Sequence, residues 1–182
     1  SDDFDFLPKD RLIEPQNLKE DIEPFIERCI ELAKLKNAKL SFYRGEFELA
    51  QEHLDILKNA TRREIANDAM DLSILIKNNT ILDSTQKALR AYADVDLMLY
   101  QNKQIKANKA LDSLIEEYEE HPILDELLWL KSRLTKQKGE YEKSIELLTQ
   151  IVYDMPYGIL TDDALFEMAM IYEELIDDKE KA

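Results

Sequence analysis

The stretch Ser132-Arg-Leu-Thr-Lys-Gln-Lys-Gly139-Glu-Tyr141-Glu-Lys-Ser144 predicts a helix end, a tight turn and the start of a second helix. Glycine readily adopts the left-handed backbone with which many helices end. A small residue seven positions before Gly139 and another five after it would let two antiparallel helices approach closely. The aromatic residue two positions after the glycine would fill the space beside the turn. This order of residue types decides the local fold.

The same order of residue types recurs along the chain. Around Gly45 the corresponding residues are Ala38, Phe47 and Ala50. A weaker copy has Asn102 in place of the glycine, with Val95 before it, Ala107 after it and Gln104 in place of the aromatic. A fourth copy begins at Asp162 and carries one extra residue before its turn. A repeated helix-turn-helix unit predicts a stack of helix pairs.

The composition agrees with a helical chain. Only 3 Gly and 5 Pro occur in 182 residues, and these are the two residue types that disturb helices most. The apolar fraction of 45% is enough for a hydrophobic core, although 35% of the residues are charged. No segment has the alternating pattern of a strand. The sequence therefore predicts an all-α fold.

Helical periodicity divides the chain into an extended lead-in, 1–16, and a repeat domain, 17–182, that ends within a repeat. The expected helices are about 17–42, 46–58, 61–77, 84–100, 105–119, 123–138, 141–154 and 161–176. Pro24 either adjusts the first of these helices or begins its main part. We expect Thr61 and Glu64 to form a capping box, Asn78–Thr80 to end the third helix, and Thr161 to cap the last one.

The spacing of the turns predicts one irregularity. Asn102 and Gly139 are 37 residues apart, which is one repeat, whereas Gly45 and Asn102 are 57 residues apart. Three helices therefore lie between the turns at Gly45 and Asn102, where regular helix pairs would place an even number. We interpret the helix at 61–77 as unpaired, or as having lost its partner to the loop at 78–83, and expect a local break in the superhelix there.

Taken together, these residues resemble the tetratricopeptide repeat family over roughly residues 28 to 182. The resemblance implies a right-handed superhelix whose first helices line a concave groove that binds extended or helical peptides. The sequence around Thr161-Asp-Asp-Ala-Leu-Phe is similar to that of tetratricopeptide proteins of Gram-negative cell envelopes. Those include the lipoprotein of the outer-membrane barrel assembly machinery and the periplasmic cell-division coordinator. A bacterial, periplasmic or envelope location is an expectation from this resemblance alone.

The resemblance also indicates which residues face such a groove. The residues ten before each turn, or eleven for the last copy, are Leu35, Tyr92, Trp129 and Phe166. Aromatic side chains give a large contact area at a small entropic cost, so these residues are candidate anchors for a partner. The other interpretation is that they pack between neighbouring helices as ordinary core.

Charged residues on the same face indicate which charge the partner carries. Glu126, Asp96 and Asp163 outnumber Lys39 and Arg133, which disfavours the carboxylate clamp that some tetratricopeptide receptors use. We expect a basic or mixed apolar and basic protein or peptide, with Arg133 among the contact residues. The formal net charge of −15 disfavours nucleic acid. No apolar run is long enough for direct membrane insertion.

Catalysis, cofactors and metals are not expected. His53 and His121 are the only histidines and are far apart in sequence, and His121 precedes a proline in an expected exposed turn. Cys29, the single cysteine, is expected to be a buried thiol on the first helix. No glycine-rich phosphate loop is present, and an enzyme would need clustered carboxylates in a closed pocket.

Two hypotheses about function remain. The first is a protein–protein interaction scaffold that binds its partner through the concave face. The alternative is a structural spacer or self-association module of a larger envelope protein, with no ligand in the groove.

Overall fold

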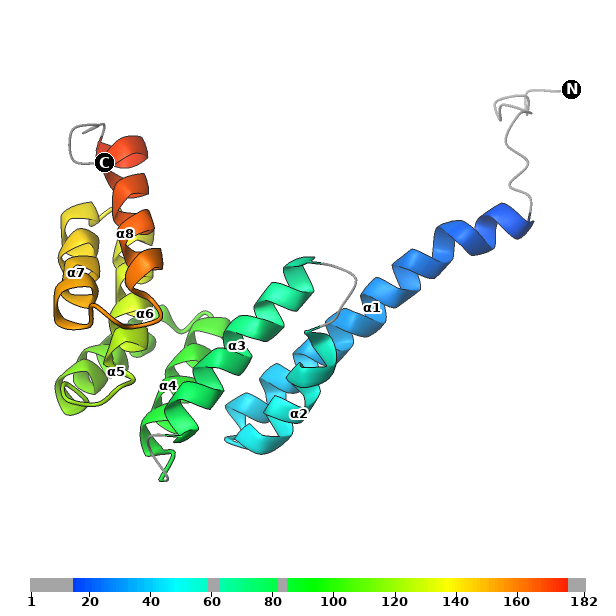
Figure 1. The fold of residues 1–182 in the computed structure, drawn as a ribbon, viewed down its shortest axis with the longest axis horizontal. Coiled ribbons are helices and arrows are strands. Elements are labelled where there is room, and N and C mark those ends of the chain that lie inside the picture. Colours follow the sequence, from blue (N-terminus) through cyan, green and yellow to red (C-terminus); the bar gives the residue numbers. More distant parts are fainter. Residues whose placement is uncertain (1–14, 59–62, 82–84, 177–182) are drawn as a thin grey trace, which may run out of the picture.

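The computed structural model describes residues 15–58, 63–81 and 85–176 (Figure 1). This part of the chain forms eight α-helices and no strand, which confirms the all-α prediction. The helices are α1 (Pro15–Tyr43), α2 (Phe47–Leu57), α3 (Arg63–Ile81), α4 (Lys87–Tyr100), α5 (Gln104–Glu117), α6 (Leu124–Gln137), α7 (Tyr141–Asp154) and α8 (Thr161–Met170). A π-helical segment, Ile171–Ile176, continues α8.

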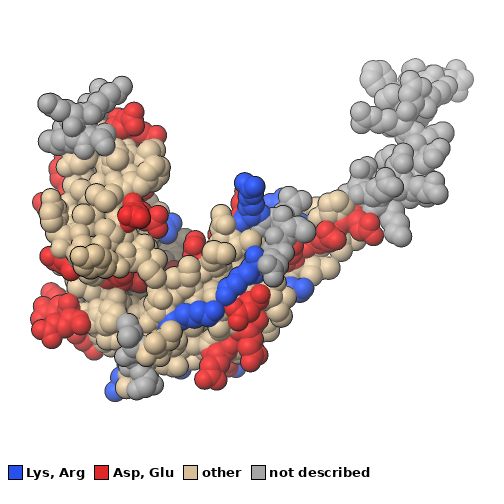
Figure 2. Space-filling view, in the orientation of Figure 1, with Lys and Arg blue, Asp and Glu red and all other residues tan. Residues whose placement is uncertain are grey.

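Neighbouring helices pack in pairs. The most extensive contacts are those of α6 with α7 and of α1 with α2, followed by α7 with α8; α2 with α3 and α4 with α5 contact each other to an equal, smaller extent. The helix predicted to be unpaired is α3, which packs mainly on α2 and also touches α1 and α4. The first hairpin therefore holds α3 in place. Figure 2 shows that the molecule is hollowed between α3 and the column formed by α6, α7 and α8.

Three turns share one backbone geometry. Gly45 and Gly139 have positive φ angles of 72° and 79°, and Asn102 has a φ of 58°. In the turn at Gly139, the N–H of Gly139 donates to the carbonyl of Lys136 at 2.9 Å, and the N–H of Glu140 donates to the carbonyl of Thr135 at 3.0 Å. The other two turns have the same pair of bonds, which satisfy carbonyls at the helix end. The prediction that Asn102 takes the place of the glycine is confirmed.

Small residues lie where the paired helices meet, as the repeated pattern predicts. Ala38 and Ala50 are fully buried, and Ser132 and Ser144 are each 1% exposed. The Ser144 hydroxyl donates to the Ser132 carbonyl at 2.9 Å, so a side chain of α7 bonds directly to the backbone of α6. A larger side chain at these positions would force the two helices apart.

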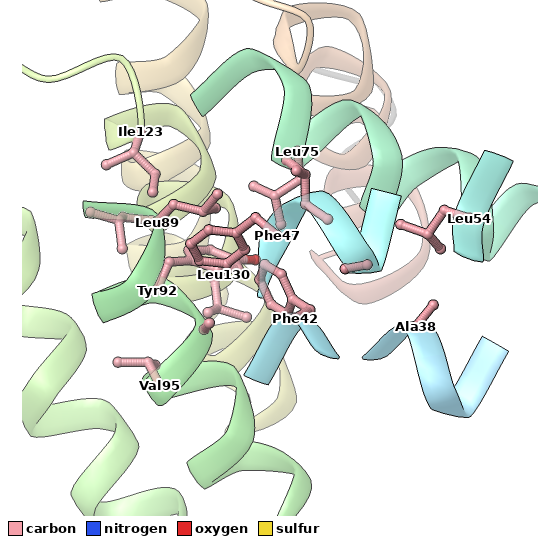
Figure 3. Close-up of a cluster of buried hydrophobic side chains, with 14 of the residues drawn as sticks. Ala38, Phe42, Phe47, Leu54, Leu75, Leu89, Tyr92, Val95, Ile123 and Leu130 are labelled. Carbon is pink, nitrogen blue, oxygen red and sulfur yellow. The ribbon is translucent and has the colours of Figure 1, made fainter. Parts of the chain in front are cut away.

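The buried side chains form two clusters that meet at α6. Leu127, Leu130 and Leu134 belong to a cluster that extends back to α1, part of which Figure 3 shows. Leu124 and Leu128 belong to a second cluster shared with α7, α8 and the π-helical segment. Two faces of one helix thus join the two cores.

Several expected helix boundaries are wrong. Asn78–Thr80 does not end α3, which continues to Ile81. The Nδ2 group of buried Asn79 donates to the Leu75 carbonyl at 2.9 Å and the Thr80 hydroxyl donates to the Ile76 carbonyl at 2.8 Å, so both side chains bond to the backbone of their own helix. The Oδ1 atom of Asn79 is buried and has no hydrogen-bond partner among the described residues. The next helix begins at Lys87 and not near residue 84.

The expected caps differ as well. Thr161 is the first residue of α8 and not its cap, because Leu160 occupies the cap position and the Thr161 hydroxyl donates to the Met155 carbonyl at 2.7 Å. The expected capping box at Thr61 lies outside the described residues.

The first helix corrects two further expectations. It begins at Pro15 and contains Pro24 in its interior, so Pro24 does not start the main helix. Cys29 is exposed and not buried. Its apolar neighbours are exposed too, because no other described element covers this part of α1. All but the last two residues of the expected lead-in, 1–16, lie outside the described part of the chain.

Candidate binding groove

A hollow with a volume of about 630 Å³ lies on the concave side of the molecule. Residues of α1, α3, α4, α6 and α8 line it, together with the segment that leads into α8. Its apolar lining includes Phe42, Leu72, Leu75, Tyr92, Trp129 and Leu160. A concave, partly apolar surface of this size is typical of binding sites.

Two aromatic residues form part of the floor where the two cores meet. Tyr92 is 9% exposed and lies in the first cluster beside Phe42 and Leu130 (Figure 3). Trp129 is half-buried and packs against the second cluster. Burial raises the pKa of the Tyr92 hydroxyl well above its ordinary value, so this group stays neutral. Trp129 thus keeps part of its side chain accessible in the hollow.

The charged lining is mostly acidic. Five carboxylates, Asp68, Asp71, Asp96, Glu126 and Asp163, face two cations, Lys39 and Arg133. Two of the carboxylates have partners: Lys39 lies 3.6 Å from Asp68, and the Tyr43 hydroxyl donates to Asp96 at 3.0 Å. The other three, on α3, α6 and α8, form no hydrogen bond or ion pair with their side chains among the described residues.

The pKa values of two of these carboxyl groups are raised, first by burial and then by neighbouring negative charges. Burial, together with the smaller effects of the negative charges of Asp125 and Asp71, raises the pKa of Glu126 to about 8. Burial, Asp68 and Asp163 likewise raise the pKa of Asp71. Carboxyl groups on two separate helices, α3 and α6, therefore hold protons more tightly than isolated ones. A cation placed among them would relieve this repulsion.

The structure brings together some of the predicted site residues. Tyr92, Trp129 and Arg133 line the groove, as do the charged residues Lys39, Asp96, Glu126 and Asp163. Leu35 does not line it, because its side chain is buried in the first core and 5% exposed. Phe166 does not line it either, and its side chain is 67% exposed on α8.

Sequence reasoning missed the wall that α3 contributes. Asp68, Asp71, Leu72 and Leu75 line the groove, but a helix thought to be unpaired had no assigned face. A signal was present, since Asp68, Asp71 and Leu75 recur at helical spacing beside the buried stripe of Ile65, Ala69 and Ile76.

A second, more open hollow of about 830 Å³ lies beside the turn at His121 and is lined by Glu116, Glu119, Glu120 and Asp125. His121 is half-buried and not fully exposed as predicted: its Nδ1 accepts the N–H of Ile123 at 3.1 Å and its ring packs against Tyr118. Among the described residues, no three metal-ligating side chains are grouped.

Fold and groove define an all-helical protein built from packed helix pairs, with an acidic concave groove. No protein-family model matches the chain, and no curated protein or solved structure is similar to it. In the described part of the chain, no helix combines the length and apolar character needed to cross a membrane.

Proposed function

We propose that this chain is a tetratricopeptide-like scaffold that binds a peptide segment of a protein partner in the groove, without catalysis. The arrangement of the lining supports this function. Tyr92 and Asp96 on α4, and Glu126, Trp129 and Arg133 on α6, come from the first helices of their hairpins. Those are the helices that line the binding groove in the family that the sequence resembles.

The observation that carries the proposal is that half-buried Trp129 lines the same hollow as carboxyl groups that have no partner within the described part of the chain. A lysine or arginine of the partner can lay its apolar stem against Trp129 and extend its charge toward Asp71 and Glu126. The approaching cation favours the ionised form of both carboxyl groups and removes their repulsion. The expected ligand is therefore an extended or helical peptide that mixes apolar and basic residues.

Selection from a random peptide library on the immobilised chain tests this proposal. We expect the recovered peptides to be rich in lysine, arginine and apolar residues. Trp129 is the only tryptophan, so a peptide in the groove should change the intrinsic fluorescence of the chain. Recovery of acidic peptides, or of none that changes this fluorescence, would refute a basic ligand in the groove.

Variants then locate the site, with affinity measured from the anisotropy of a labelled selected peptide. Asp71→Lys reverses an exposed charge in the groove and should weaken binding by roughly fivefold, or about 1 kcal/mol. Asp94→Lys makes the same change on an exposed part of α4 outside the groove and should have little effect. Phe166→Ala should also leave affinity unchanged. Equal losses in Asp71→Lys and Asp94→Lys would place binding elsewhere.

A further inference from the structure

The first half of α1 stands clear of the rest of the molecule (Figure 1). From Ile22 to Lys34 every side chain is exposed except that of Glu31, which is half-buried. Large apolar side chains are nevertheless frequent here: Ile22, Phe25, Ile26 and Ile30 are 41%, 64%, 49% and 48% exposed. A surface of this kind on a projecting helix indicates an interaction site.

The exposed residues form one continuous stripe. We define the outer stripe of α1 as Ile22, Phe25, Ile26, Cys29, Ala33 and Leu40, which recur at spacings of three, four and seven residues. Leu40 is 55% exposed, whereas Ala38 and Phe42, two residues to either side, are buried. Residues two apart on a helix point to nearly opposite sides. The outer stripe therefore faces away from α2, α4 and the groove.

Charges along the same helix suggest what covers the stripe. Between Ile22 and Glu31 the helix carries Glu23, Glu27 and Glu31 against a single Arg28, and of these Glu31, seven residues before Ala38, lies on the side opposite the stripe. Between Leu32 and Leu40 it carries Lys34 and Lys36, besides Lys39, which pairs with Asp68 at the groove, and no acidic residue. An identical helix running in the opposite direction would place each acidic half beside a basic half. A parallel copy would place like charges together.

Side-chain size agrees with an antiparallel register centred on Cys29. In that register Phe25 lies opposite Ala33 of the other copy, which pairs a large side chain with a small one. Glu23 lies near Lys34, and Ile22 lies opposite the aliphatic stem of Lys36. Cys29 lies near its own symmetry mate. A two-fold pairing of this type uses the same patch on both copies and closes without leaving a free end.

We propose that the chain forms an antiparallel two-fold dimer with a second copy of itself through the outer stripe of α1. Phe42 lines the groove and lies on the opposite side of α1, so the dimer keeps both peptide grooves open. Two grooves held on one particle would bind a partner with several basic segments more tightly than one groove does.

Sedimentation equilibrium of the whole chain, over a range of concentrations, tests the association. The unaltered chain should show a monomer–dimer equilibrium, and Phe25→Glu should weaken it by about tenfold or more. Phe166→Glu is the matched control, because it makes the same change at a side chain of nearly equal exposure, 67% against 64%, and should leave the equilibrium unchanged. Both replaced side chains are exposed, and circular dichroism checks that each variant folds.

Disulfide trapping tests the orientation. Mild oxidation should link the unaltered chain through Cys29, and Phe25→Glu should suppress this product. In a Cys29→Ser background, a mixture of Ile22→Cys and Lys36→Cys chains should give mainly the mixed disulfide dimer. Mainly homodimeric disulfides would overturn the antiparallel arrangement.

Two results would overturn the dimer itself. One is a monomer at every concentration, which would leave another segment or another protein to cover the stripe. The other is equal association of the Phe25→Glu and Phe166→Glu chains. Neither result affects the groove, because peptide binding is measured independently.

Discussion

At the residue scale, the left-handed turn positions decide where helices reverse. A Cβ added at Gly139 would meet no atom within 4 Å, so a substitution there tests backbone conformation alone. Gly139→Ala should lower the free energy of unfolding by about 1 kcal/mol, because an L-residue is strained at positive φ. Urea unfolding measures the change. Lys138→Ala, at the neighbouring residue in right-handed geometry, is the control and should have little effect.

A second residue-scale prediction concerns Glu126 and pH. Its pKa is raised from 4.5 to about 8 in the folded chain, so the folded state keeps a proton that the unfolded state releases between these values. Stability contributed at this site is therefore lost as pH rises through that window. Glu126→Gln cannot ionise and should be more stable than the unaltered chain by about 2 kcal/mol near pH 9, but equal to it near pH 4.

The measurement is the free energy of unfolding in urea at both pH values. Glu52→Gln, at an exposed position in the middle of α2, serves as the control. A gain from Glu126→Gln that is the same at both pH values would contradict a buried, protonated carboxyl group and indicate a change in packing.

Residue types alone predicted the turns but not all the helix ends. Gly45, Gly139 and Asn102 are readable because few residues adopt positive φ readily. Asn79 and Thr80 misled the prediction because both residue types favour turns, yet here they donate to carbonyls four residues back within α3. Such a side chain can either stabilise a turn or bond to a carbonyl inside a helix. The choice depends on whether tertiary packing stabilises the longer helix.

At the element scale, an amphipathic pattern tells which side of a helix is apolar but not whether anything covers it. Cys29 was expected to be buried for this reason, but it is exposed on α1, as is Phe25 on the same stripe. The converse holds for α6, where apolar residues around most of the helix are explained by two cores, one on each side. Coverage depends on neighbouring elements, and periodicity within one helix carries no information about them.

At the scale of the whole molecule, the groove was partly predictable because repeats place equivalent residues on one surface. Tyr92 and Trp129 were found in this way, since each stands ten residues before a turn. The α3 wall was not found, because the irregular spacing between Gly45 and Asn102 breaks the register on which that inference rests. A repeat predicts the site only as far as it is regular.

The two cores predict how the whole molecule unfolds. Leu54 in the first cluster and Leu148 in the second are both fully buried leucines, so each change to alanine should lower stability by about 3 kcal/mol. In stacked helix pairs each unit contacts only its neighbours, so the loss should stay near the altered core. Hydrogen exchange should therefore quicken mainly in α7 and α8 for Leu148→Ala, and mainly in α1 to α3 for Leu54→Ala. Uniform acceleration across all helices in both variants would instead show that α6 couples the two cores into one cooperative unit.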